Sequence, residues 1–486
     1  DPDVIRVEDT YYMVSTTMHF MPGCEILQSF DLVHWEHVTY VYETLDHTDA
    51  QQLKSGQNIY GQGMWAASLR YHEGRFCICF VANDTRKTYL YTSEKIDGPW
   101  KKQLIEGFYH DGSLLFDEDG RNYIVYGNDE IWITELNEDL TAPKKDGLHR
   151  LLVSDHKNPE LGYEGSHIQK INGYYYIFLV HSLRDRWMRT EACFYSDSLE
   201  GEFTGGDVLC DDRGYCGQGV AQGGIVDTPD GKWYAMLFQD SGAVGRIPIL
   251  LPVTWKDHFP FFGQNGHVPE EIEVHSTRPG YIYQPLVGSD DFCNGLLPRW
   301  QFNHDPDPRY YHLDALQGTY TITTREVCTE LTQAVNTLTQ RMSYPSCAAE
   351  VTVDASALKE GDVAGLCALQ GCYAAVGITK HHGKYEVLML DKKEDGILDM
   401  TEGTVVESHQ MDFRLEADFC NMKDEARCYY RVNKGDWLPI GTVHKLYFKL
   451  DHFTGCRFGL FCYAAEETGG SACFRDFKYY DVDEIS

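Results

Sequence analysis

The sequence predicts an all-β protein, with a five-bladed β-propeller over residues 1–285 and a jelly-roll-like β-sandwich over residues 286–486. Three observations support this fold class. A hairpin pattern recurs five times in the first half, short alternating strands fill the second half, and amphipathic helical periodicity is scarce throughout. A chain of 486 residues suits two domains, and an apolar fraction of 43% is ample for their cores.

Each repeat of the first half is a tight acidic or glycine-containing turn followed by an aromatic-rich strand. The five copies lie at residues 8–15, 72–79, 117–126, 170–178 and 229–237. Their Asn-Gly and Asp-Gly pairs predict type I′ hairpins. A strand precedes each turn, and an outer element follows several copies. Units of about four short strands, spaced at roughly fifty residues, are typical of propeller blades.

The repeat ends in turn-rich segments around residues 256–290, and a different domain begins near Ser289. Short alternating strands follow, and examples are residues 348–353, 374–378, 385–390 and 447–450. This alternation is typical of an antiparallel sandwich. We expect this domain to be structural or to lend a loop to the rim of the propeller.

The charge of the chain excludes some partners. Lys and Arg total 42 against 74 for Asp and Glu, a formal net charge of −32. A field of that sign repels nucleic acids and anionic membranes, whereas a neutral polysaccharide is compatible with it. No apolar run approaches the length that spans a bilayer, and no signal peptide is visible.

The 16 cysteines include no Cys-x-x-Cys pair, and most lie in apolar surroundings. We therefore expect free core thiols, which favour a reducing compartment and a cytoplasmic location. The chain opens inside what looks like a motif. We expect the natural chain to extend upstream of Asp1 and to hold it in place, so export stays open.

Three acids occupy equivalent positions in the repeat. The innermost strands of a propeller line its channel, so the residues just before each repeat's first strand face one another. Those positions hold Asp1, Asp111 and Glu164 in blades one, three and four, and Trp65 and Gln222 in blades two and five. One Asp-Pro at a strand start is ordinarily a turn. Three carboxylates in register indicate a site.

Such carboxylates suit the hydrolysis of a glycosidic bond. One protonated acid donates to the leaving oxygen, and one ionised acid activates water or attacks the sugar. A third acid raises the pKa of the donor and holds it in place. We find no phosphate-binding Gly-rich loop, no serine nucleophile elbow and no His-Glu-x-x-His.

Five motifs carry a resemblance to a known family, and they cover the propeller in order. They are the Asp1-Pro2-Asp3-Val4-Ile5-Arg6 opening, Gly63-Met64-Trp65-Ala66, His110-Asp111-Gly112-Ser113-Leu114, Glu164-Gly165-Ser166-His167 and Gly245-Arg246. The chain resembles glycoside hydrolase family 43, whose five-bladed propellers release xylose or arabinofuranose from plant cell-wall polysaccharides with inversion. The second domain resembles the sandwich of the family's β-xylosidase and α-L-arabinofuranosidase branch.

The resemblance implies a role for each matched residue. Asp1 is similar to the general base, Asp111 to the acid that tunes the donor's pKa, and Glu164 to the general acid. Arg246 resembles an arginine that grips sugar hydroxyls. Trp65 and Phe20 are candidates for the walls of the sugar pocket. Asp3 is the alternative base, but its spacing to Arg6 places it on the other face of the strand or in a turn.

The chain also departs from the family pattern. Many members have a fifth-blade histidine that helps to hold an axial calcium ion or water, and Gln222 stands at the matching place. We therefore expect no required cofactor and no protein metal site, while a calcium ion, a monovalent ion or water on the axis stays open. His19 is either a pocket hydrogen-bonder or an ordinary loop histidine. We expect His167 to orient the structure beside Glu164.

The predicted function is an exo-acting inverting glycoside hydrolase that releases terminal α-L-arabinofuranose from arabinoxylan-type oligosaccharides. β-D-Xylose is a second product, because the two sugars present their hydroxyls similarly. The alternatives are a β-xylosidase acting on xylo-oligosaccharides, a non-catalytic carbohydrate-binding propeller and a purely structural scaffold. The expected partners are neutral plant cell-wall oligosaccharides, and the sequence leaves the oligomeric state open.

Overall fold

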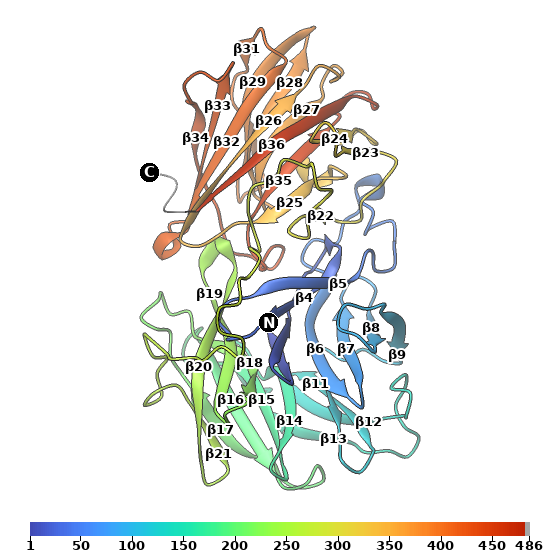
Figure 1. The fold of residues 1–486 in the computed structure, drawn as a ribbon, viewed down its shortest axis with the longest axis vertical. Coiled ribbons are helices and arrows are strands. Elements are labelled where there is room, and N and C mark those ends of the chain that lie inside the picture. Colours follow the sequence, from blue (N-terminus) through green and yellow to red (C-terminus); the bar gives the residue numbers. More distant parts are fainter. Residues whose placement is uncertain (482–486) are drawn as a thin grey trace.

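The computed structural model describes residues 1–481 and confirms the predicted propeller and sandwich (Figure 1). The propeller consists of five four-stranded antiparallel sheets, and the sandwich of a nine-stranded and a seven-stranded sheet. Over the described residues the helical elements are four short 3-10 turns, Lys54–Gly56, Gly242–Val244, Leu331–Gln333 and Cys420–Met422. None of these is long and apolar enough to cross a membrane.

Each blade orders its strands outward from the channel in chain order. Blade one contains β1 Asp3–Val7, β2 Thr10–Val14, β4 Gly23–Ser29 and β5 Glu36–Tyr42. Blade two contains β6 Met64–His72, β7 Arg75–Ala82, β8 Lys87–Ser93 and β9 Lys101–Ile105. Blade three contains β10 Ser113–Phe116, β11 Asn122–Asn128, β12 Glu130–Leu136 and β13 His149–Ser154. Blade four contains β14 Glu164–Ile171, β15 Tyr174–Ser182, β16 Arg189–Ser196 and β17 Thr204–Leu209. Blade five contains β18 Ala221–Asp227, β19 Trp233–Asp240, β20 Arg246–Lys256 and β21 Phe259–Phe262.

The five predicted hairpins are the innermost hairpins of the five blades, but their turns differ in type. Asn172 and Gly173 both have positive φ, 51° and 85°, as a type I′ turn requires. In blades three and five only the glycine does, at Gly120 and Gly231. There the glycine N–H bonds back to the carbonyl three residues earlier, in a longer turn. The type I′ prediction is therefore wrong for those two blades, because the longer loop needs one left-handed residue.

The innermost strands close into a ring around the channel. Strands β1, β6, β10, β14 and β18 contact one another in that order, and β18 also contacts β1. Arg6 pairs with Asp227 at 2.5 Å across this last junction. On the axis, the fully buried Asp3 accepts from Arg70 at 2.7 Å and lies 3.1 Å from Nδ1 of His167. The ends of the inner strands are therefore fixed relative to one another.

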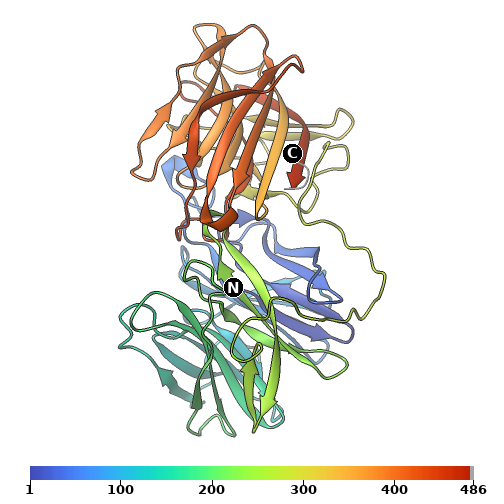
Figure 2. The same cartoon turned by 90° about the vertical axis from the view of Figure 1, so that its left-hand side faces the viewer.

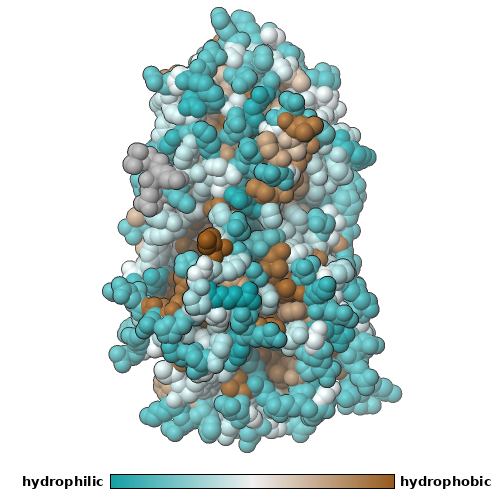
Figure 3. All heavy atoms as spheres, in the orientation of Figure 1, coloured by the Kyte–Doolittle hydropathy of each residue, from teal (hydrophilic) through white to brown (hydrophobic). Residues whose placement is uncertain are grey.

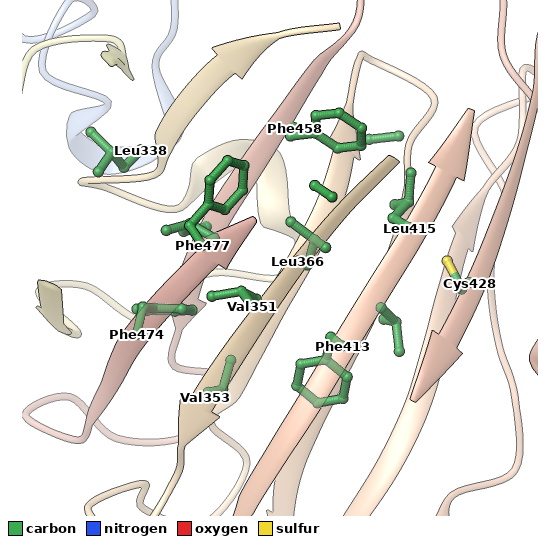
Figure 4. Close-up of a cluster of buried hydrophobic side chains, with 14 of the residues drawn as sticks. Leu338, Val351, Val353, Leu366, Phe413, Leu415, Cys428, Phe458, Phe474 and Phe477 are labelled. Atoms are coloured by element: carbon green, nitrogen blue, oxygen red, sulfur yellow. The ribbon is translucent and has the colours of Figure 1, made fainter. Parts of the chain in front are cut away.

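The sandwich buries the alternate residues of its two sheets against each other. The nine-stranded sheet contains β3 Phe20–Met21, β22 Gln301–Asn303, β25 Leu338–Arg341, β35 Arg457–Tyr463, β27 Val363–Leu369, β28 Ala374–His381, β29 Lys384–Lys392, β30 Leu398–Met400 and β31 Thr404–Val406. The seven-stranded sheet contains β23 Tyr311–Asp314, β24 Thr319–Thr323, β36 Ser471–Asp481, β26 Ser346–Asp354, β32 Gln410–Asp418, β33 Glu425–Val432 and β34 Leu438–Lys445. Val351, Val353, Phe413 and Phe474 are among the core side chains (Figure 4).

Two connections tie the domains together. The two-residue strand β3, which lies in the connection between β2 and β4 of blade one, pairs with β22 of the sandwich. The segment between β21 and β22 runs back along blade one (Figure 2), where Arg278 pairs with Asp9 at 2.8 Å and the backbone N–H of Phe30 donates to Tyr283 at 2.8 Å. On the face shown in Figure 3 the surface is largely hydrophilic, and apolar side chains gather near the middle.

Residues 447–450, predicted as a strand, form no strand. Side-chain bonds hold this stretch as a loop instead. The Tyr447 hydroxyl lies 2.9 Å from the Asp451 carboxylate and accepts the backbone N–H of Cys372, while Gln370 bonds its backbone. All 16 cysteines lie in the described residues and are free, as predicted.

Candidate active site

Asp1, Asp111 and Glu164 lie at the same end of their inner strands, as the register predicted. Asp1 and Asp111 each precede their strand, β1 or β10, by two residues, and Glu164 is the first residue of β14. The side chain of Asp1 is 5% exposed and that of Glu164 is 21% exposed. Glu164 is therefore the acid most open to an incoming ligand.

Both oxygens of the Asp1 carboxylate accept hydrogen bonds. Thr16 donates its hydroxyl to Oδ2 at 2.5 Å, and Nη1 of Arg246 donates to Oδ1. Arg246 is itself fixed, because its Nε donates to Asp240 at 3.2 Å. Asp240 also accepts from Arg189. This chain of charged groups sets the direction of the Asp1 carboxylate.

The side chains of Asp111 and Glu164 both lie close to the imidazole of His110. Nε2 of His110 lies 3.5 Å from Glu164 Oε2 and 3.7 Å from Asp111 Oδ2. Asn128, the last residue of β11, donates to Glu164 Oε2 at 2.7 Å. The backbone N–H of Gly165 donates to Asp111 at 3.1 Å. Asp111 has a left-handed backbone with φ of 47°, which aims its side chain at this N–H.

The charges of Asp111 and His110 depend on one another. Burial raises the pKa of Asp111 above its ordinary value and Glu164 adds to the rise, while His110 opposes it. The Asp111 carboxylate in turn raises the pKa of His110 to about 9. A protonated imidazole therefore lies between two carboxyl groups at neutral pH.

The sandwich contributes Phe453 to this site. Phe453 follows the 447–450 loop, and its ring lies 4.3 Å from the Arg246 guanidinium. The other face of Arg246 packs on Phe238 at 4.4 Å. Phe453 also meets Trp65 edge-on at 5.5 Å, and Trp65 lies 6.0 Å from His110. A continuous row of contacts thus leads from Asp1 through Arg246, Phe453, Trp65 and His110 to Glu164.

The three acids line neither of the two larger cavities, although Arg246, which bonds Asp1, borders the second. One of about 410 Å³ opens among the inner strands, where Arg6, His72 and Asp227 are part of its lining. Another of about 490 Å³ lies at the domain junction beside Glu25 and Arg341. The site is identified by its acids rather than by cavity size.

Family comparisons agree with this geometry along the whole chain. The sequence profile of glycosyl hydrolases family 43 matches residues 1–260. A second profile, the β-xylosidase C-terminal concanavalin A-like domain, matches residues 289–480. The chain belongs to glycoside hydrolase family 43.

Relatives of this family 43 enzyme carry two kinds of name. A β-xylosidase from Formosa agariphila is 26% identical over 99% of this chain and 87% of its own length. A xylosidase/arabinosidase from Humicola insolens is 25% identical over 99% of this chain and 95% of its own. A solved structure described as a bifunctional GH43-CE protein from Bacteroides eggerthii is 41% identical, with a TM-score of 0.92. The match covers 100% of this chain and 62% of the length of that protein.

Two residues predicted to line the pocket of the family 43 enzyme, Phe20 and His19, are buried elsewhere in the structure. Phe20 and His19 are both 0% exposed, so neither side chain is accessible to a sugar. Phe20 packs under the guanidinium of Arg457 at 3.7 Å, and His19 lies against His304 at 4.7 Å. The predicted wall role of Phe20 and the pocket role of His19 are therefore wrong, because the pairing of β3 with β22 draws both into the domain interface.

The other predicted residues lie in or behind the site. Trp65 and Arg246 are in the row of contacts described above, and Arg246 bonds the carboxylate of Asp1 directly. Gln222 is 4% exposed and packs behind Gly165. Asp3 lies in β1 rather than in a turn. Burial favours a higher pKa for Asp3, but the Arg70 guanidinium and His167 bring its pKa below the ordinary value.

Six residues that contact the acids or their partners were not predicted from the sequence: Thr16, His110, Asn128, Arg189, Asp240 and Phe453. Only His110 had a signal, because it directly precedes Asp111 in a quoted motif. Of the others, Asn128, Arg189 and Asp240 lie at strand ends, Thr16 lies in the loop after β2, and Phe453 lies in the second domain. Their proximity depends on blade curvature and domain docking, which sequence spacing does not encode.

The residues on the axis do not fit a calcium ion, which takes six to eight oxygen ligands. Asp3 is already engaged by Arg70, His167 and the backbone N–H of Leu69. Among the described residues, His110, Asp111 and Glu164 bring possible ligand atoms within 4.8 Å of one another. A metal held by Glu164 would occupy the oxygen that a proton donor needs, so no step of the mechanism uses one.

Proposed function

We propose that the enzyme is an exo-acting, inverting glycosidase that removes terminal α-L-arabinofuranosyl units from xylan-type oligosaccharides, with β-D-xylosyl units as a second substrate. One observation carries this proposal. Asp1 and Glu164 lie at the start of the inner strands of non-adjacent blades, Asp1 two residues before β1 and Glu164 as the first residue of β14. Each has its own hydrogen-bonding partners, a cation and a hydroxyl for Asp1 and an amide for Glu164. Two separately held carboxyl groups suit an acid and a base on opposite faces of a sugar.

In the proposed mechanism Glu164 donates its proton to the glycosidic oxygen as the bond from that oxygen to the anomeric carbon breaks. Asp1 takes a proton from the water that attacks the anomeric carbon from the opposite face. Asn128 and His110 hold the Glu164 carboxyl toward the substrate. Asp111 accepts the backbone N–H of Gly165, the residue after Glu164, and so helps to fix the position of the donor.

The names of the relatives bear on the sugar specificity. The relatives carry the names β-xylosidase and xylosidase/arabinosidase, so both pentoses are candidate substrates. The first of these names favours a β-xylosidase acting on xylo-oligosaccharides as the second candidate. We infer that the row of contacts through Phe453 forms one wall of the site, which favours attack at a chain end over attack within a polymer.

Two substitutions test the assignment of the acids. We expect Asp1→Asn and Glu164→Ala each to lower kcat on xylo- and arabinoxylo-oligosaccharides by about 10²–10⁴-fold, because each removes one proton transfer. Turnover of nitrophenyl α-L-arabinofuranoside and β-D-xyloside then ranks the two sugars. Wild-type turnover by either variant would contradict the proposal. Faster turnover of the xyloside would select the second candidate.

A further inference from the structure

Glu191 is a buried carboxyl group that the proposed mechanism does not use. It lies in β16, two residues after Arg189, and is 0% exposed. Its Oε2 accepts the backbone N–H of Gln222 at 2.6 Å, and its Oε1 has no hydrogen-bond partner. Burial raises the pKa of Glu191 well above its ordinary value and so favours the neutral form of this carboxyl group. A buried polar group with one free oxygen is costly, and an apolar side chain would fill the space without that cost.

Glu191 and the proposed general acid Glu164 lie in the same blade, with one strand between them. Glu164 pairs with Val180 across β14 and β15, and Val180 pairs with Glu191 across β15 and β16. Directly opposed residues project from the same face of a sheet. Two strand spacings therefore place Glu191 about 10 Å from Glu164 on one face of blade four.

Glu191 accepts the backbone N–H of Gln222, which has a strained backbone and a side chain that packs on Gly165 beside the site. Gln222 has a left-handed backbone, with φ of 65°, inside an irregularity at the start of β18. Its side chain packs on Gly165, where an added Cβ would lie 2.7 Å from Cγ of Gln222. A non-glycine residue in this conformation needs outside support. The hydrogen bond to Glu191 supplies it.

Gly165 connects Gln222 to both acids, because it follows Glu164 in the chain and donates a hydrogen bond to Asp111. It has φ of 68° and follows Glu164 directly, at the irregular start of β14. Its N–H donates to Asp111 at 3.1 Å. The packing of Gln222 on Gly165 thus fixes the peptide that joins Glu164 to the Asp111 carboxylate.

We infer that Glu191 is a positioning residue for proton donation: through Gln222 and Gly165 it sets the orientation of the Glu164 and Asp111 carboxyl groups. This inference rests on the proposed role of Glu164 as the general acid. It predicts that loss of Glu191 impairs protonation of the leaving group rather than substrate binding.

The test compares leaving groups. Dinitrophenolate departs without a proton, whereas a sugar alcohol needs one, so a defect in acid catalysis appears mainly with oligosaccharides. We expect Glu191→Met to lower kcat on oligosaccharides by about 30-fold and on the dinitrophenyl glycoside by less than about threefold, with KM nearly constant. Glu191→Gln keeps an acceptor for the Gln222 N–H and stays within about threefold of wild type on both substrates.

Two further variants decide the remaining outcomes. Gln222→Gly keeps the left-handed backbone but removes the packing on Gly165, and it reproduces the selective loss even where Glu191→Met fails to fold. Glu164→Ala sets the scale, because direct removal of the acid gives the largest difference between leaving groups. An equal loss on both substrates, or no loss, in the folded variants overturns the role of Glu191. Absence of any leaving-group dependence in Glu164→Ala instead overturns the proposed function.

Discussion

His110 is the residue that most changes the charge balance of the site. Its imidazole lies within 3.7 Å of both Asp111 and Glu164, and Asp111 raises its pKa to about 9. A histidine whose folded pKa exceeds its ordinary value of about 6.5 stabilises the fold fully below pH 6.5 and loses that contribution as the pH rises through 9. The charge on His110 therefore connects the stability of the fold to the ionisation of the acids.

The pH dependence of this stabilisation gives a direct prediction for the variant His110→Gln. The melting temperature of the variant should lie below that of wild type at pH 6, and the difference should shrink as the pH approaches 10. Thermal unfolding followed by circular dichroism from pH 6 to 10 measures it. A difference that stays constant with pH would show that the imidazole is not charged in the folded protein.

Phe453 shows what a single loop element contributes. The loop over residues 447–455 leaves the sandwich and lays this ring on Arg246, which holds Asp1. Phe453 is only 1% exposed, so it acts by fixing Arg246 and Trp65 rather than as a broad contact surface for substrate.

We expect Phe453→Leu to lower kcat/KM roughly tenfold, because a stacked cation over an aromatic ring contributes about 0.5–2 kcal/mol. Leucine keeps most of the buried volume, so the fold survives. Leu450→Ala is the matched control, since Leu450 lies in the same loop and is 60% exposed. Steady-state kinetics of the two variants check this, and equal effects in both would assign the loss to the loop as a whole.

The elements were largely predictable from the sequence, but their ends were not. Alternation and turn residues located the five inner hairpins, because each hairpin is specified within about ten residues. The same reasoning took Tyr447–Leu450 for a strand, although side-chain bonds to Gln370, Cys372 and Asp451 hold it as a loop. It also placed Phe20 in the sugar pocket, because the pairing of β3 with a strand of the other domain has no local signal.

The acids were predictable for a different reason. Asp1, Asp111 and Glu164 occupy equivalent positions of a repeat, so the repeat itself brought them into register. Of the groups that orient them, Asn128 and Asp240 each end the second strand of their blade, and Phe453 lies in the other domain. Their contacts depend on the three-dimensional packing of blades and domains.

The whole molecule is joined at a buried interface that contains three histidines. His19 of the propeller lies against His304 at 4.7 Å and His452 at 5.3 Å, with Tyr60 packed beside them. Both ring nitrogens of His19 lack a hydrogen-bond partner among the described residues. Burial brings the pKa of His304 to about 3 and that of His19 well below its ordinary value, and Arg457 also disfavours charge on His19.

These lowered pKa values predict acid sensitivity of the fold. Above pH 6.5 His19 and His304 are neutral in both the folded and the unfolded chain. As the pH falls further, only the unfolded chain gains their protons, so stability is lost. His19→Phe removes one such group and breaks no hydrogen bond. Between pH 7 and pH 5 we expect the free energy of unfolding to fall by about 2 kcal/mol more in wild type than in the variant. Denaturant unfolding at both pH values measures the change, and an identical loss would contradict the assignment.

The central claim is that Asp1 and Glu164 act as base and acid in a single displacement. The most direct measurement is proton NMR of the sugar released in the first minutes of hydrolysis of an α-L-arabinofuranoside, before mutarotation. Inversion predicts that the β-anomer of arabinose appears first and the α-anomer grows in later. Initial release of the α-anomer would mean retention, and it would contradict the roles proposed for both carboxyl groups.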